Sequence, residues 1–216
     1  MSAGHALHVI ADQRDLGALP AALRGGVGAV QVRNKSLPAA DLLAAARRAG
    51  PICRAAGVLL LINDRVDVAL ACGADGVHLA ARSLPPADAR RIFGGLVGVS
   101  VHDLAGAVAA AAAGADYVTF GHVYPTSSKP GLPPQGLRAL AAVVEAVDVP
   151  VLAIGGIGPG NAAEVLATGC AGIAVISSIL AAENPEVAAH SLRVALDAST
   201  ATPRKELGWH AVARER

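Results

Sequence analysis

The chain has 216 residues, and its 18 Lys and Arg against 17 Asp and Glu give a formal net charge of +1. A balance so near neutrality offers no electrostatic footprint for nucleic acid or for an acidic membrane surface, so we expect neither as a partner. Apolar residues make up 53 % of the chain and aromatic residues 2 %. The first value argues against disorder, and the second against a stacking platform or a haem pocket.

No segment predicts export or membrane insertion. The longest apolar runs, such as Val58 to Ile62, are too short to span a bilayer, and the residues after Met1 lack the pattern of a signal peptide. Cys53, Cys72 and Cys170 lie far apart without CxxC spacing, which favours buried small side chains over a disulfide frame or a zinc site. We therefore expect a cytoplasmic protein.

Short β-rich apolar runs alternate with Ala-rich helical segments along the chain. Strands are expected at Leu7–Ala11, Ala29–Arg33, Leu59–Asn63, Gly76–Leu79, Leu96–Val101, Tyr117–Gly121, Val149–Gly156 and Gly172–Ser178. Helices are expected at Leu16–Arg24, Pro38–Ala56, Val66–Cys72, Pro85–Phe93, Leu104–Ala113, Leu137–Val147, Asn161–Thr168 and Pro185–Leu196. Unbroken apolar strands are typical of parallel sheets buried on both faces.

A strand–helix unit repeated eight times predicts the α/β class and a (β/α)8 TIM barrel over residues 1–198, followed by a charged C-terminal tail, 199–216. The alternative is an open doubly wound sheet, which the absence of a Gly-rich dinucleotide loop after the first strand disfavours. In such barrels the catalytic groups come from the carboxyl ends of the strands and the loops that follow.

Two of these loops indicate an anion site. Gly155 and Gly156 permit close backbone approach to a ligand, and Ser177 and Ser178 follow the last strand with hydroxyls and free amides. A phosphate site after strands seven and eight is common in this fold. The alternative for the glycine pair is an ordinary tight turn.

Other polar residues follow the remaining strands. Arg33 and Lys35 can reach an anionic substrate or can be solvated surface charges. Asn63 and Asp64 can bind a ligand or metal, or can cap the next helix. His78 and His102 are interpreted as structural. The proline-rich segment 121–136 has the length of a functional lid, and His122 at its start can exchange protons near neutral pH or can be a packing residue.

As an ordered set, the motifs of this chain resemble the thiamine phosphate synthase superfamily from the first strand through the last. The motifs are Gln31-Val32-Arg33-Asn34-Lys35, Asn63-Asp64-Arg65-Val66-Asp67, Gly76-Val77-His78-Leu79, Ala115-Asp116-Tyr117-Val118, Thr126-Ser127-Ser128-Lys129, Ala153-Ile154-Gly155-Gly156-Ile157 and Gly172-Ile173-Ala174-Val175-Ile176-Ser177. The superfamily contains a synthase, which joins a pyrimidine diphosphate to a thiazole phosphate, and a thiazole tautomerase (the TenI branch), which aromatises a thiazole phosphate carboxylate.

Two positions depart from the synthase pattern and favour the tautomerase, an isomerase. Where synthases resemble one another in a His-Leu-Gly-Gln-x-Asp segment whose Asp helps to hold magnesium, this chain has Ser83 beside Arg82. Where synthases usually have Gly-Pro after strand six, it has Gly121-His122. Because Mg²⁺ is held by one or two carboxylates plus substrate phosphates, we expect no bound metal. The alternatives are the synthase itself and a non-catalytic thiamine-precursor binding or regulatory protein.

The resemblance to the tautomerase branch implies the following chemistry. His122 removes the C2 proton of a 2-carboxy-4-methylthiazole ethyl phosphate tautomer and protonates the exocyclic carbon; nothing is oxidised, so no cofactor is implied. The substrate-binding residues expected are Arg33, Lys35, Asn63, Ser100, Thr126, Ser128, Lys129, Gly156, Ile176 and Ser177. Family members suggest a homo-oligomer.

Overall fold

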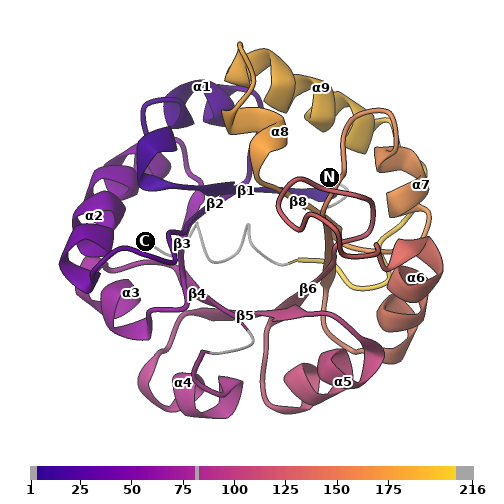
Figure 1. Ribbon diagram of the computed structural model, residues 1–216, viewed down its shortest axis with the longest axis horizontal. Helices are drawn as coiled ribbons and strands as arrows, with labels where there is room; N and C mark the ends of the chain where they lie inside the picture. Colours follow the sequence, from indigo (N-terminus) through magenta and orange to yellow (C-terminus); the bar gives the residue numbers. More distant parts are fainter. Residues whose placement is uncertain (1–3, 81–82, 208–216) are drawn as a thin grey trace.

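The computed structural model describes residues 4–80 and 83–207 and shows a closed barrel of eight parallel strands. The strands are β1 Ala6–Ala11, β2 Ala29–Val32, β3 Leu59–Asn63, β4 Gly76–Leu79, β5 Leu96–Val101, β6 Tyr117–Gly121, β7 Val151–Ile154 and β8 Gly172–Val175. They pair in chain order, and β8 closes the ring on β1 (Figure 1). The predicted (β/α)8 architecture is confirmed.

Helices surround the barrel on its outside (Figure 1). They are α1 Leu19–Arg24, α2 Ala39–Ala55, α3 Val66–Cys72, α4 Pro86–Ile92, α5 Leu104–Ala112, α6 Gly136–Ala146, α7 Ala162–Leu166, α8 Ser177–Leu180 and α9 Pro185–Asp197, with a 3-10 turn η1 at Gln13–Asp15. None of those in the described part of the chain is both long and apolar enough to cross a membrane.

The last two strands are shorter than predicted. The seventh was expected over Val149–Gly156 but ends at Ile154, because Gly155 and Gly156 take positive φ angles of 100° and 69° that turn the chain out of the sheet. The eighth was expected to reach Ser178 but ends at Val175, and Ser177 begins the short helix α8. Both corrections fall where the sheet gives way to loops around the barrel mouth.

The barrel interior is filled by pairing glycines with large side chains on neighbouring strands. Gly98 of β5 lies in register with Tyr117 of β6, and a Cβ at Gly98 would stand only 2.1 Å from the Tyr117 ring. A Cβ at Gly76 would lie 2.4 Å from a methyl of Leu61. Interiors pack at nearly crystalline density, so these glycines create the space that Tyr117 and Leu61 fill. The lower part of the barrel is therefore a solid plug.

The C-terminal segment closes the bottom of the barrel. After α9 the chain turns in towards the barrel axis (Figure 1), and Leu207 packs on the interior cluster that contains Tyr117 and Leu152. The Arg204 amide donates to the Gly169 carbonyl at 2.9 Å, and Lys205 pairs with Asp148 at 3.2 Å. The described part of the tail, 199–207, thus packs against the barrel, while Trp209 lies outside the described residues.

Replacing Leu207 by Ala should destabilise the protein by about 1–2 kcal/mol, because a half-buried leucine loses its contacts with the inner cluster. Urea unfolding followed by circular dichroism measures the change. Leu70→Ala is the matched control, since Leu70 on α3 is 52 % exposed. Equal effects of the two substitutions would mean that the segment does not seal the barrel.

Candidate active site

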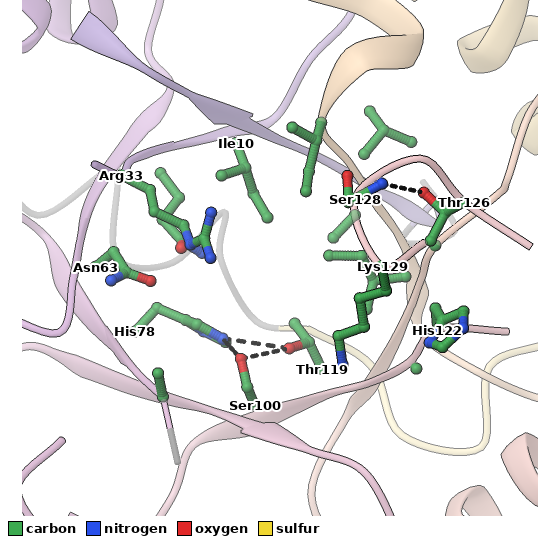
Figure 2. Close-up of a pocket in the computed structure, with 18 of the residues that line it drawn as sticks. Ile10, Arg33, Asn63, His78, Ser100, Thr119, His122, Thr126, Ser128 and Lys129 are labelled. Carbon is green, nitrogen blue, oxygen red and sulfur yellow. Dashed lines mark hydrogen bonds between the residues drawn. The ribbon is translucent and has the colours of Figure 1, made fainter. Parts of the chain in front are cut away.

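The carboxyl ends of the strands surround a pocket of about 820 Å³, shown in Figure 2. Every site residue expected from the sequence borders it: Arg33, Lys35, Asn63, Ser100, His122, Thr126, Ser128, Lys129, Gly156, Ile176 and Ser177. The fold thus brings together side chains that lie up to 144 positions apart, 177 minus 33. Their individual roles in binding and catalysis stay predictions.

Three cations border the pocket. Arg33 and Lys35 follow β2, and Lys129 reaches into the pocket from the loop after β6 (Figure 2). Burial lowers the pKa of Arg33, while burial and then the charge of Lys35 lower the pKa of Lys129. Among residues 4–80 and 83–207, no carboxylate forms an ion pair with any of the three. Unpaired cations in a cavity indicate an anionic ligand.

Asn34 fixes the loop that carries two of these cations. Its side-chain amide donates to Asp12 at 2.6 Å, and its side-chain oxygen accepts from the amides of Ser36 at 2.8 Å and Leu37 at 3.0 Å. These bonds occupy the Asn34 side chain within the protein. Arg33 and Lys35 on either side of it therefore extend from a braced turn, which lowers the entropy lost when they bind a ligand.

The loops after β7 and β8 offer backbone groups to the same pocket. Gly155, Gly156 and Ser177 border the cavity, and the first amides of α8 have no acceptor within their own helix. The Ser178 hydroxyl donates to the Ile157 carbonyl at 3.2 Å, which joins the loops after β7 and β8. This arrangement of exposed amides suits a phosphate group.

The glycine pair is not merely an ordinary turn, because other groups approach both residues closely. A Cβ at Gly155 would lie 2.3 Å from the His122 Cβ, and one at Gly156 would lie 2.5 Å from the Pro125 carbonyl oxygen. The loop is further held by Asn161, whose side chain donates to the Gly156 carbonyl at 3.0 Å and accepts from the Gly158 amide at 2.8 Å. Larger residues could not occupy either glycine position.

Asp64 contributes a carboxylate to the pocket and does not cap a helix. The N-cap of α3 is Arg65, so the capping interpretation of Asn63 and Asp64 is wrong. Asp64 is the only acidic residue among the described residues that border the cavity. Ser83 does not border it, since its hydroxyl accepts from the Ala80 amide at 2.6 Å in a local turn, and Arg82 lies outside the described residues.

The described residues that border the pocket provide too few carboxylates to form a magnesium site by themselves. Mg²⁺ is usually held by one or two carboxylates together with substrate phosphates. Among the described residues no group of three His, Cys, Asp or Glu side chains could hold a metal, and Asp64 shares its pocket with several cations. The donor set therefore fits a metal ion poorly and a polyanion well.

A buried hydrogen-bond network forms the floor of the pocket. His78 bonds with the Tyr117 hydroxyl at 3.0 Å and with the Ser100 hydroxyl at 2.9 Å, and Thr119 lies 3.2 Å from the same His78 nitrogen (Figure 2). Burial and then the charge of Arg33 lower the pKa of His78 to about 3, so the ring is neutral at pH 7. His78 is bonded within this network and also borders the pocket, and its interpretation as structural stays a prediction.

Sequence reasoning missed Thr119 and Tyr117 as members of this floor. The signal was present, because Tyr117, Thr119 and Gly121 alternate along one strand and so share its inward face. The apolar run hid this alternation, since both faces of a barrel strand are buried.

A (β/α)8 barrel whose carboxyl-end pocket is bordered by cations and by loop backbone has the arrangement typical of enzymes of this fold that act on anionic substrates. A family model described as thiamine monophosphate synthase matches residues 6–179. The chain belongs to that family and is an enzyme of thiamine biosynthesis.

Relatives and solved structures agree over most of the chain. It is 45 % identical over 212 residues to a thiamine-phosphate synthase of Methanoculleus marisnigri, covering 93 % of this chain and all of that protein. It is 44 % identical over 193 residues to one of Chlorobium luteolum, covering 88 % and 91 %. Thiamine phosphate pyrophosphorylase from Pyrococcus furiosus superposes with a TM-score of 0.82 at 39 % identity, covering 88 % and 95 %.

The assignment to the tautomerase branch, and with it the isomerase class, is wrong. The similar curated proteins are named thiamine-phosphate synthases, and the similar solved structure is a pyrophosphorylase. The assignment rested chiefly on residues 82, 83 and 122, with Lys129-Pro130-Gly131-Leu132 and Ser100-Val101-His102 taken as fitting the same pattern. The structure shows that Ser83 accepts a hydrogen bond in a turn and does not border the pocket. The superfamily resemblance itself is confirmed.

The buried histidines should make stability fall in mild acid. His8 and His78 have their pKa lowered by burial to about 3 in the folded protein, against 6.5 for an ordinary histidine. Between these values the unfolded chain binds more protons than the folded one, so stability rises with pH from about 3 to about 6.5. Urea unfolding should therefore show a lower free energy at pH 5.5 than at pH 7. His78→Gln should reduce that difference by about 1 kcal/mol; an unchanged difference would show that His78 is not held neutral.

Proposed function

We propose that this protein is a thiamine-phosphate synthase, a transferase that couples hydroxymethylpyrimidine diphosphate to a thiazole phosphate and releases diphosphate. The observation that carries the proposal is that two different kinds of surface border one pocket. One carries three cations that have no ion-pair partner among the described residues, and the other is the backbone of the loops after β7 and β8. A reaction between a diphosphate and a monophosphate needs two such surfaces. The names of the similar proteins support the same reaction.

The reaction breaks one bond and forms one. The bond between the pyrimidine methylene carbon and the diphosphate oxygen breaks, and its electron pair leaves with the diphosphate. The lone pair of the thiazole ring nitrogen then forms the new carbon–nitrogen bond. Charge thus accumulates on the leaving diphosphate, and cations placed beside it in advance lower the barrier.

The residues divide this work between them. Arg33, Lys35 and Lys129 are placed to neutralise the diphosphate, while Gly156 and Ser177 are placed to hold the thiazole phosphate through backbone amides. Ser100 on the floor between them offers a hydroxyl to the rings, and the neutral His78 behind it adds no competing charge. Holding both substrates in one cavity supplies the proximity that the coupling needs.

Replacing Lys129 by Met should lower kcat/KM for coupling by about 10²-fold, because one charge opposite the leaving group is lost. The assay mixes both phosphorylated substrates and measures thiamine phosphate and diphosphate. Lys205→Met is the control, since Lys205 pairs with Asp148 away from the pocket. Failure of the unmodified protein to form thiamine phosphate would refute the proposed function.

The cationic surface should bind diphosphate without a divalent ion. Calorimetry with inorganic pyrophosphate in EDTA should show binding, and magnesium alone should bind weakly, because Asp64 is the single carboxylate among the described residues at the pocket. Asp64→Asn should then strengthen pyrophosphate binding by removing a negative charge. Pyrophosphate binding that requires magnesium and is abolished by Asp64→Asn would contradict this prediction.

A further inference from the structure

The loop between β6 and α6 forms a lid over the pocket and is closed at its base by backbone bonds. The Gln135 amide donates to the His122 carbonyl at 2.8 Å, and the Gly136 amide donates to the Val123 carbonyl at 3.1 Å. The segment between them, 124–134, carries Thr126, Ser128 and Lys129 to the pocket. The base therefore fixes where the lid starts and ends, and other contacts must fix its tip.

One such contact comes from the His122 side chain, which is 5 % exposed. Its Nε2 lies 3.1 Å from the Leu132 carbonyl oxygen. A carbonyl can only accept, so Nε2 carries the hydrogen and donates it to the far arm of the lid. The bond spans ten residues of the loop and joins its first residue to Leu132.

A second contact comes from His102 at the end of β5. Its Nδ1 lies 2.8 Å from the Gly121 carbonyl oxygen and so donates to it, which leaves Nε2 as the acceptor of the neutral ring. The Lys129 ammonium lies 3.5 Å from that Nε2. His102 thus presents a lone pair to the cation of the lid, and it is itself oriented by the residue that precedes His122.

The tip of the lid transmits these contacts to Lys129. The Lys129 amide donates to the Thr126 carbonyl at 3.2 Å, and the Leu132 amide donates to the Lys129 carbonyl at 3.5 Å. Two consecutive turns therefore connect Thr126 to Lys129 and Lys129 to Leu132, and the prolines at 130 and 133 restrict the same stretch. Fixing the Leu132 carbonyl limits where the Lys129 backbone can lie.

We propose that His102 and His122 are positioning residues that hold the lid closed, so that the Lys129 ammonium faces the diphosphate site opposite Arg33 and Lys35. This inference rests on the proposed function for the identity of the ligand. Like charges repel, and the charge of Lys35 already acts on Lys129. Without the two histidines, Lys129 would move away from Lys35 while the pocket is empty. Ligand binding would then have to close the lid, and the free energy of closing would reduce the favourable free energy of binding.

The first test measures the dissociation constant of inorganic pyrophosphate by calorimetry. His122→Leu and His102→Leu should each weaken binding about 3- to 10-fold, the range expected for one hydrogen bond. His122→Gln places an amide donor near the position of Nε2 and should recover binding to within about 2-fold of the parent. His190→Leu, on the exposed face of α9, is the matched control and should leave binding unchanged.

A double-mutant cycle shows whether the histidines act through Lys129. In a Lys129→Met background, neither histidine substitution should weaken pyrophosphate binding further, because the group that they position is gone. Hydrogen exchange of residues 126–136 should be faster in His122→Leu than in the parent and the His190 control. Unaltered exchange, or the same fold-loss with and without Lys129, would overturn the proposal. Since His102 is exposed, its variant keeps the test valid even if His122→Leu fails to fold.

The binding and exchange measurements use neither organic substrate, so, set beside the coupling assay, they separate the two proposals. If the double-mutant cycle gives the expected pyrophosphate affinities but the protein forms no thiamine phosphate, the lid proposal stands and the proposed function is refuted. If the protein forms thiamine phosphate but the histidine substitutions leave pyrophosphate binding unchanged, the proposed function stands and the lid proposal is refuted.

Discussion

The central physical constraint on this site is that Arg33, Lys35 and Lys129 border one pocket without a carboxylate ion-pair partner among the described residues, and that the charge of Lys35 acts on Lys129. Each would lower its energy by moving into solvent. Each is held instead: the first two by a turn that Asn34 braces, and the third by a lid bonded to the barrel. A polyanion in the pocket would neutralise these charges, so we expect affinity to rise with the number of negative charges on the ligand.

That constraint is tolerable only on a rigid scaffold. The interior below the pocket is solid because Gly76 and Gly98 make room for Leu61 and Tyr117, and Leu207 packs on the cluster from below. In a deformable barrel the strand ends could move apart, and the cations that follow them would no longer surround one pocket. The packing at the bottom of the barrel therefore supports the charged groups at its top, and the buried hydrogen bonds of His78 connect the two levels.

The sequence predicts the barrel and the pocket well for a physical reason. Strand ends in a closed parallel barrel must meet at one rim, so residues such as Lys35 and Ser177, far apart in the chain, can be placed together without knowledge of any contact. The ends of strands seven and eight could not be predicted, because backbone angles at Gly155 and the start of α8 depend on loops from other strands. The tautomerase assignment failed because it relied chiefly on positions such as 83 and 122, whose side-chain surroundings only the fold reveals.

The two anion-binding surfaces differ in kind, and the difference suits the proposed reaction. Backbone amides around Gly156 and Ser177 are fixed by the loops that contain them and cannot follow a ligand as it moves. They suit a thiazole phosphate, which stays attached from substrate to product. The cations include Lys129, which a long loop carries and which the proposed histidine contacts tie to the ends of β5 and β6. A side-chain cation on a loop suits a diphosphate, which must be held tightly while its bond breaks and then released. If the backbone amides held the diphosphate instead, the leaving group would be bound by donors whose positions are fixed by their loops. Release of diphosphate would then be slower than the other steps of the catalytic cycle.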